Sequence, residues 1–96
     1  MSDTIHPLQG EWTIHQIAEL REALRPVVAQ GCSQFDGADV SEMDSSGLQV
    51  LLAARNTLAS QGREIHLLHA SRPMREVLSC YGLDENLIPL HPEALS

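Results

Sequence analysis

A short polar turn between two apolar segments constrains the fold more than any other part of this sequence. The turn, residues 44–47, follows Val40-Ser41-Glu42-Met43 and precedes an aliphatic stretch. Asp and Ser are favoured at helix N-termini because their short side chains accept hydrogen bonds from the free N–H groups of the first turn. Ser46 and Gln49 also have the spacing of a capping box, with Ser46 as the cap. We therefore predict a strand end, a tight turn and a helix that has Ser45 and Ser46 at its N-terminus.

The residues after this turn predict a helix with one buried face. Apolar side chains recur at helical spacing, at Leu48, Leu51, Leu52, Leu58 and Ala59. Gly62 fits the C-terminal cap, because glycine readily takes the left-handed conformation that such caps use.

A second helix is predicted closer to the N-terminus. Thr13 and Gln16 form another capping box. The apolar positions that follow are Ile14, Ile17, Leu20, Leu24, Val27 and Val28. Pro26 lies inside this pattern and should kink or loosen the last turn.

A third helix is predicted to begin after Ser71, which caps it, with Pro73 in its first turn. Its buried stripe should be formed by Met74, Val77, Leu78 and Tyr81. Gly82 followed by Leu83 matches a Schellman end. Cys80 is expected to fill space on the helix face.

Strand signals alternate with these helices, at Thr4–Leu8, Gln34–Val40, Glu64–His69 and a last short segment, Leu87–Leu90. Pro7 cannot donate to a ladder, so the first strand should have an open side. The second strand is polar and is predicted mainly from its place between two helices. The third has both faces partly apolar, as in a sheet covered on two sides. The alternation predicts right-handed βαβ units.

The fold class is therefore α/β, a small and mostly parallel β-sheet with packed helices, and residues 1–96 should form a single domain. The predicted core contains Leu48, Leu51, Leu52, Ile65, Leu67, Val77 and Leu78.

The charge balance excludes several classes of partner. Thirteen carboxylates face six positive charges, all of them Arg, which gives a net charge of −7. This argues against nucleic acid or an anionic membrane surface as a partner. The chain has no apolar run long enough to insert into a membrane and no signal-peptide pattern, so we expect a cytoplasmic protein with reduced cysteines.

The sequence also lacks the patterns of an enzyme. His66 and His69 should point to opposite faces of a strand, and the other histidines have no partner at ligand spacing, so no metal site is expected. There is neither a nucleophile elbow nor a glycine-rich phosphate loop. We expect no catalytic residue and no cofactor.

The pattern apolar-x-x-Met43-Asp44-Ser45-Ser46-Gly47-Leu48, followed by the helix, Gly62, a strand and a helix ending in Tyr81-Gly82-Leu83, resembles the STAS family. The resemblance covers roughly Leu8 to Leu90. This family includes anti-sigma factor antagonists, domains of sulfate transporters and a subunit of a lipid-transport ABC complex. By this resemblance we expect a domain shortened at both ends, without the usual strand before Thr4–Leu8 and without the closing helix. It also carries a more polar second strand, and Glu42 replaces an apolar residue.

The resemblance implies a phosphorylation switch. In anti-sigma factor antagonists the first Ser of Asp-Ser-Ser-Gly is phosphorylated, and that position is Ser45 here. The unmodified protein binds an anti-sigma factor that is also the serine kinase, and phosphorylation ends the binding. By this resemblance Asp44, Ser45, Ser46 and Gly47 form the switch turn and bind the partner, with Asp44 presenting Ser45 and Ser46 chiefly capping the helix.

An alternative within the same family is a STAS subunit that binds the ATPase of a lipid-transport ABC complex. The ending Tyr81-Gly82-Leu83 and the short chain resemble that branch as well. Its members usually have Thr and Gly where this chain has Ser45 and Ser46, which favours the switch.

Overall fold

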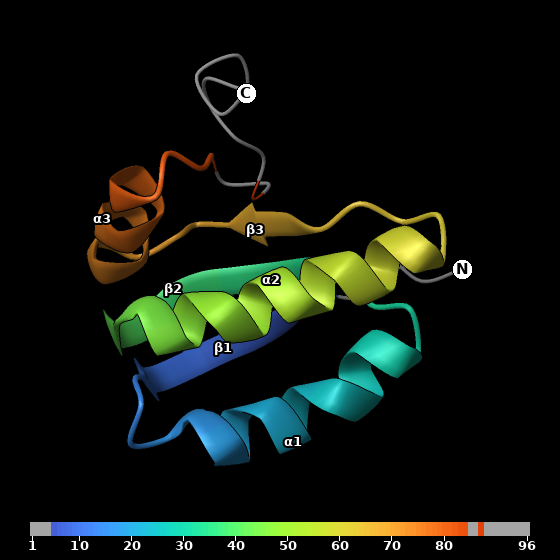
Figure 1. The fold of residues 1–96 in the computed structure, drawn as a ribbon, viewed down its shortest axis with the longest axis horizontal. Helices are drawn as coiled ribbons and strands as arrows, with labels where there is room; N and C mark the ends of the chain where they lie inside the picture. Colours follow the sequence, from blue (N-terminus) through green and yellow to red (C-terminus); the bar gives the residue numbers. More distant parts are fainter. Residues whose placement is uncertain (1–4, 85–86, 88–96) are drawn as a thin grey trace.

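The computed structural model describes residues 5–84 and 87 (Figure 1). Its elements are β1 (Ile5–Trp12), α1 (Ile17–Ala29), β2 (Gln34–Met43), α2 (Ser45–Ser60), β3 (His66–Leu68) and α3 (Arg72–Cys80). All strand pairs are parallel, in the order β1-β2-β3. The predicted α/β class is confirmed. The predicted last strand, Leu87–Leu90, lies outside the described residues except for Leu87.

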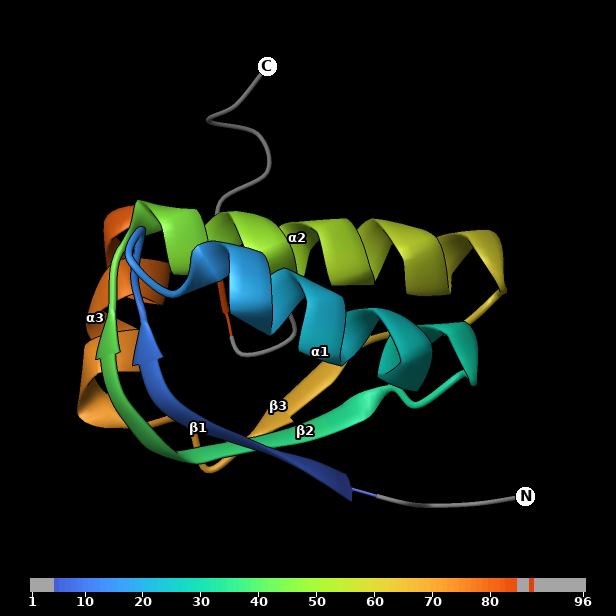
Figure 2. The same ribbon diagram turned by 90° about the horizontal axis from the view of Figure 1, so that it is seen from below.

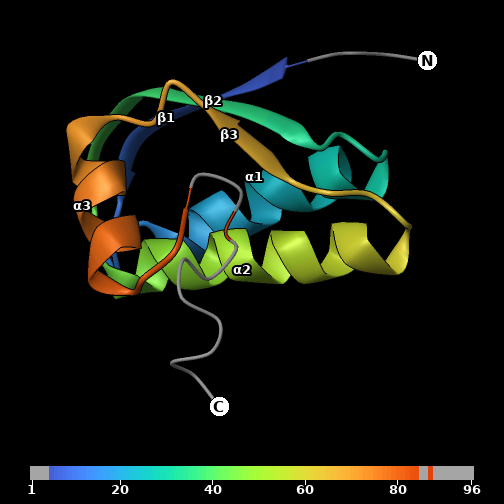
Figure 3. The ribbon, with the colours of Figure 1, turned by 90° about the horizontal axis from the view of Figure 1, so that it is seen from above.

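Helices α1 and α2 lie side by side on one face of the sheet, and α3 lies at one end of the strands (Figures 2 and 3). Helices α1 and α3 are on opposite sides of α2 (Figure 1). None of the helices among the described residues covers the other face. The prediction of a sheet covered on two sides is therefore wrong for this part of the chain. The half-buried side chains of β3 make both faces of this strand partly apolar, although no second layer of helices covers the sheet among the described residues.

Strand bounds differ from the prediction because pairing extends farther than the local sequence signal. β1 continues to Trp12, which is 2% exposed and pairs with Met43 at the end of β2. β3 is only three residues long. Within the described chain β1 is an edge strand, so the open side expected at Pro7 is confirmed.

The polar strand β2 has a physical explanation in its buried face. Phe35, Gly37 and Val40 are buried. A Cβ added at Gly37 would overlap the Met74 side chain, so glycine permits the close approach of α3. The residue that disfavours a strand by propensity is therefore favoured by packing, since a larger one would displace the Met74 side chain.

The core lies between the sheet and α1 and α2. Side chains from every element form it: Leu8, Trp12, Leu24, Val28, Phe35, Val40, Leu48, Val50, Leu51, Ala54, Leu58, Ile65, Leu67, Ala70, Met74, Leu78 and Leu87. Of the predicted core, Leu52 and Val77 are only partly buried. Ala59, predicted on the buried face of α2, is exposed.

The start of α1 differs from the predicted capping box. The helix begins at Ile17, and its N-cap Gln16 makes no side-chain hydrogen bond. Thr13 Oγ1 is buried without a hydrogen-bond partner, and the main chain of residues 13–16 forms a turn in which Gln16 N donates to Thr13 O (2.9 Å). Ile14, predicted to be buried, is 62% exposed because it precedes the helix.

Both ends of α3 confirm the prediction. Ser71 is the N-cap, and its side chain accepts a hydrogen bond from Met74 N. Leu83 N donates to Leu78 O (2.9 Å) and Gly82 N donates to Ser79 O (3.0 Å), with Gly82 at φ 67°, which is a Schellman motif.

Two residues near the end of α3 are not where the sequence placed them. Tyr81 is 54% exposed instead of buried, because it is the C-cap, where the helix direction is lost. Cys80 is also exposed and does not fill the helix face.

Candidate functional site

The turn between β2 and α2 is held by one carboxylate. Asp44 is the N-cap of α2, and its Oδ1 accepts hydrogen bonds from Ser46 N (2.9 Å) and Gly47 N (3.2 Å). The predicted cap, Ser46, lies within the first turn of the helix instead. Asp44 takes the cap because its extended backbone, with φ −126° and ψ −173°, directs the short side chain back over the helix end.

Asp44 also ties this turn to the loop after β1. Its Oδ2 accepts a hydrogen bond from Ile14 N (3.0 Å), and its own N–H donates to Trp12 O (3.1 Å). A Cβ at Gly47 would overlap the same Trp12 carbonyl oxygen, so only glycine permits this contact. The two loops therefore form one rigid unit around Asp44.

The ionised form of Asp44 is favoured by these contacts. Partial desolvation raises the pKa of its carboxyl, but the N–H donors of Ile14, Gly47 and Ser46 together with the nearby His15 outweigh it. The net effect lowers the pKa below the ordinary value of 3.8. The carboxylate is thus charged at neutral pH, which is favourable at a helix N-terminus.

Ser45 is exposed at the first residue of α2. It lines a shallow hollow whose other wall is α3, formed by Glu76, Val77, Cys80 and Tyr81. With the cap supplied by Asp44, the Ser45 side chain makes no hydrogen bond to any residue that the structure describes. Its hydroxyl is presented to solvent beside the aliphatic and aromatic side chains of α3.

Two exposed apolar residues contact this turn or the hollow beside it, although the apolar periodicity of the sequence predicted both to be buried. Ile14 is 62% exposed and is fixed by its N–H bond to Asp44. Tyr81 is 54% exposed and shares the hollow with Ser45. The signal for Tyr81 was the Gly82 that follows it, since the residue before a left-handed cap glycine is the C-cap, where the helical path ends. We call Ile14, Ser45 and Tyr81 the apical surface.

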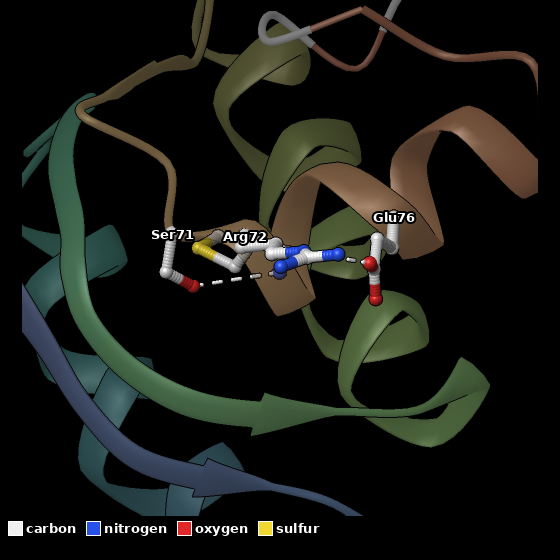
Figure 4. Close-up of polar contacts among 4 residues, drawn as sticks. Ser71, Arg72 and Glu76 are labelled. Carbon is white, nitrogen blue, oxygen red and sulfur yellow. Dashed lines mark hydrogen bonds and ion pairs between the residues drawn. The ribbon is translucent and has the colours of Figure 1, made fainter.

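A side-chain cap and an exposed ion pair lie at the start of α3 (Figure 4). Arg72 Nε lies 3.1 Å from Glu76 Oε2, one helical turn along the same face, and Ser71 caps the helix just before it. Both side chains of this ion pair are exposed, so it contributes little to stability. The Glu76 carboxylate that lines the hollow is thus paired with Arg72.

The described part of the chain has neither a cluster of metal ligands nor a helix that could span a membrane. Across residues 5–84 and 87, no three His, Cys, Asp or Glu side chains gather where they could hold a metal ion. No helix in the same residues has the length and hydropathy needed to cross a bilayer. His69 falls just beyond the end of β3, with φ 53°, so the expected placement of His66 and His69 on one strand is wrong.

The parallel sheet, its helices and the strand–turn–helix motif between β2 and α2 are those of a STAS-type domain. The chain belongs to the family described as Mlab, STAS domain, whose model matches residues 3–90. It is also similar to the solved structure of the anti-sigma factor antagonist SpoIIAA in its unphosphorylated form, with 27% identity and a TM-score of 0.59. That likeness covers 78% of this chain and 71% of the other. None of the curated proteins matches. The predicted resemblance to the STAS family is thus confirmed.

Proposed function

We propose that this protein is an anti-sigma factor antagonist-like regulator that is switched by phosphorylation of Ser45. The observation that carries this proposal is that two neighbouring residues of the turn have separate roles. Asp44 caps the helix and leaves the neighbouring Ser45 hydroxyl exposed at the helix start. The similarity to SpoIIAA supports the same role.

The partner we propose is an anti-sigma factor that is also a serine kinase, bound in the cytoplasm while Ser45 is unmodified. The apical surface suits such a partner because Ile14 and Tyr81 are large apolar side chains left in contact with water. Exposed aromatic and aliphatic side chains of this kind serve as anchors that enter pockets on a partner. Asp44, Ser46 and Gly47 act in this proposal by fixing the turn that carries Ser45.

A phosphate on Ser45 affects the fold and the interface differently. It adds about −1.5 to −2 charge. The N-terminus of α2 favours an anion by about 0.3–1 kcal/mol, so the domain stays folded. The same charge lies beside Val77 and Tyr81 and near the Glu76 carboxylate. A partner that covers this hollow with apolar groups must desolvate the phosphate, and binding is lost.

The test is calorimetric titration of the cognate anti-sigma factor kinase with Ser45 variants. We expect Ser45→Ala to bind like the wild type but to accept no phosphoryl group from ATP. Ser45→Asp should weaken binding at least tenfold while keeping the wild-type melting temperature. Ser60→Asp is the matched control, because it adds the same charge at the far end of α2 and should leave the affinity unchanged. Equal affinity of wild type and Ser45→Asp would contradict the switch.

A second candidate function is favoured by the family model, whose description names Mlab. In that case the chain is a STAS subunit that binds the ATPase of a lipid-transport ABC complex. The apical surface would then be a constitutive interface, and Ser45 would help to pack it without being modified. Titration with such an ATPase separates the two functions. The transporter-subunit function is supported if the chain binds the ATPase tightly and if treatment with a serine kinase and ATP does not weaken this binding. Tyr81→Ala should weaken it.

A further inference from the structure

The outer face of α1 carries a self-complementary pattern that the proposed function does not use. Ala18, Glu22, Arg25 and Ala29 follow one another at intervals of four, three and four residues, so they form one stripe along the helix. All four are exposed. The order of side chains along the stripe is the same from either end: one small residue, two charged residues and one small residue. The acid, Glu22, lies in the first half and the base, Arg25, lies in the second.

From this pattern we infer that α1 is the interface of a symmetric homodimer, in which it packs antiparallel against α1 of a second copy. A two-fold axis between Glu22 and Arg25 places Glu22 opposite the second copy's Arg25, and Arg25 opposite its Glu22. Ala18 then meets the Ala29 of the second copy, which lets the two helices approach closely. Each pairing occurs twice, as a two-fold axis requires.

The neighbouring groove supplies apolar surface for the same contact. A groove of about 290 Å³ lies between α1 and α2 and shares Arg25 and Ala29 with the stripe. The other side chains that line it are Arg21, Leu24, Val28, Val50, Ala53, Ala54 and Thr57. No carboxylate lines the groove, and its walls carry mainly small aliphatic groups. A helix lying over the stripe therefore also covers the groove.

A second copy fits this surface because Glu22 and Arg25 each meet the opposite charge when α1 packs antiparallel against itself. In the monomer Arg25 Nη2 and Glu22 Oε2 are 3.2 Å apart, and the side chains are 66% and 67% exposed. In the dimer, the Glu22–Arg25 pair within each chain can be replaced by two equivalent Glu22–Arg25 pairs between the two chains. Since exposed pairs are weak, we expect a concentration-dependent dimer that weakens as salt rises. Helix α1 is on the opposite side of α2 from α3 (Figure 1), so the dimer leaves the α3 wall of the hollow uncovered.

The test is a charge-reversal experiment followed by sedimentation equilibrium at low salt. Glu22→Arg gives a chain with two bases on the stripe, and Arg25→Glu gives a chain with two acids. Each variant alone should be monomeric, because like charges face each other. An equimolar mixture of the two should form a heterodimer at least as readily as the wild type forms its homodimer. The double variant Glu22→Arg/Arg25→Glu should dimerise like the wild type.

The matched control reverses a comparable exposed ion pair elsewhere. Arg72→Glu acts on the pair with Glu76 on α3 and should leave the dimer unchanged. Thermal melts of every variant establish that a monomeric result is not caused by unfolding. A wild type that stays monomeric up to about 1 mM would overturn the inference, because that concentration corresponds to the weakest affinity of interest. A mixture no more associated than its components would overturn it equally.

Discussion

At the scale of single residues, the candidate site depends on which side chain caps α2. The Asp44 carboxylate accepts from Ile14 N, Ser46 N and Gly47 N, and so it holds both the helix start and the loop after β1. The sequence suggested Ser46 as the cap because Ser46 and Gln49 have the capping-box spacing. The outcome was decided by the strand register, which ends β2 at Met43 and leaves Asp44 as the first residue outside it.

Removing this carboxylate should therefore cost more than removing the Ser46 hydroxyl. We expect Asp44→Ala to lower the free energy of unfolding by about 1–2 kcal/mol, in the upper part of the range for a lost helix cap. Ser46→Ala should change it by less than about 0.5 kcal/mol, the usual limit for a side chain without such a role. Urea denaturation of the two variants measures both values. A larger loss for Ser46→Ala would mean that Ser46 is the cap.

The lowered pKa of Asp44 also makes a prediction about pH. A carboxyl whose pKa is lower in the folded than in the unfolded protein stabilises the fold above the unfolded pKa, near 3.8. That stabilisation is lost as the pH falls through the folded value. The stability advantage of the wild type over Asp44→Asn should thus be constant between about pH 5 and 7 and shrink below about pH 4. Denaturant melts of both proteins across this range measure the difference. An advantage that grows on acidification would show that the sign of the shift is wrong.

At the scale of elements, local signals predicted helices better than strands. Ser71, Gly62 and Gly82 mark helix ends through contacts within a few residues, and such contacts can be read from the chain. The bounds of β1 and β2 depend on their pairing with each other, which the local sequence does not contain. Gly37 shows the same limit, since it argues against a strand until Met74 of α3 is seen to lie against it.

Helix α2 offers a direct test of this packing. Leu51 is fully buried between the sheet and the neighbouring helices, and its neighbour Leu52 is only partly buried. We expect Leu51→Ala to lower the free energy of unfolding by about 2–5 kcal/mol, because it removes buried methyl groups and leaves a cavity. Leu52→Ala is the control on the same turn and should cost clearly less. Equal losses in urea melts would mean that the buried face of α2 is wrongly assigned.

At the scale of the whole molecule, the fold class and the position of the turn could be predicted from the sequence, but the apical surface could not. The periodicity of strand and helix signals defines a parallel sheet with helices, and the Asp-Ser-Ser turn places Ser45 at a helix start. Ile14 and Tyr81 match the same apolar periodicity as the core and were assigned to it. Each lies just outside a helix, where the period no longer indicates burial. The sequence also predicted a sheet covered on both faces. Half-buried side chains make both faces of a strand partly apolar, so the sequence pattern does not distinguish one covered face from two.

The hydrogen bond between Ile14 and Asp44 joins residues 30 positions apart in the chain, and this has a consequence for protein synthesis. Ile14 leaves the ribosome early, the turn that fixes it follows much later, and Tyr81 emerges only after α3 has been made. The three parts of the apical surface therefore come together only when nearly the whole domain is available to fold. A nascent chain that ends before α3 therefore exposes Ile14 without presenting the complete apical surface.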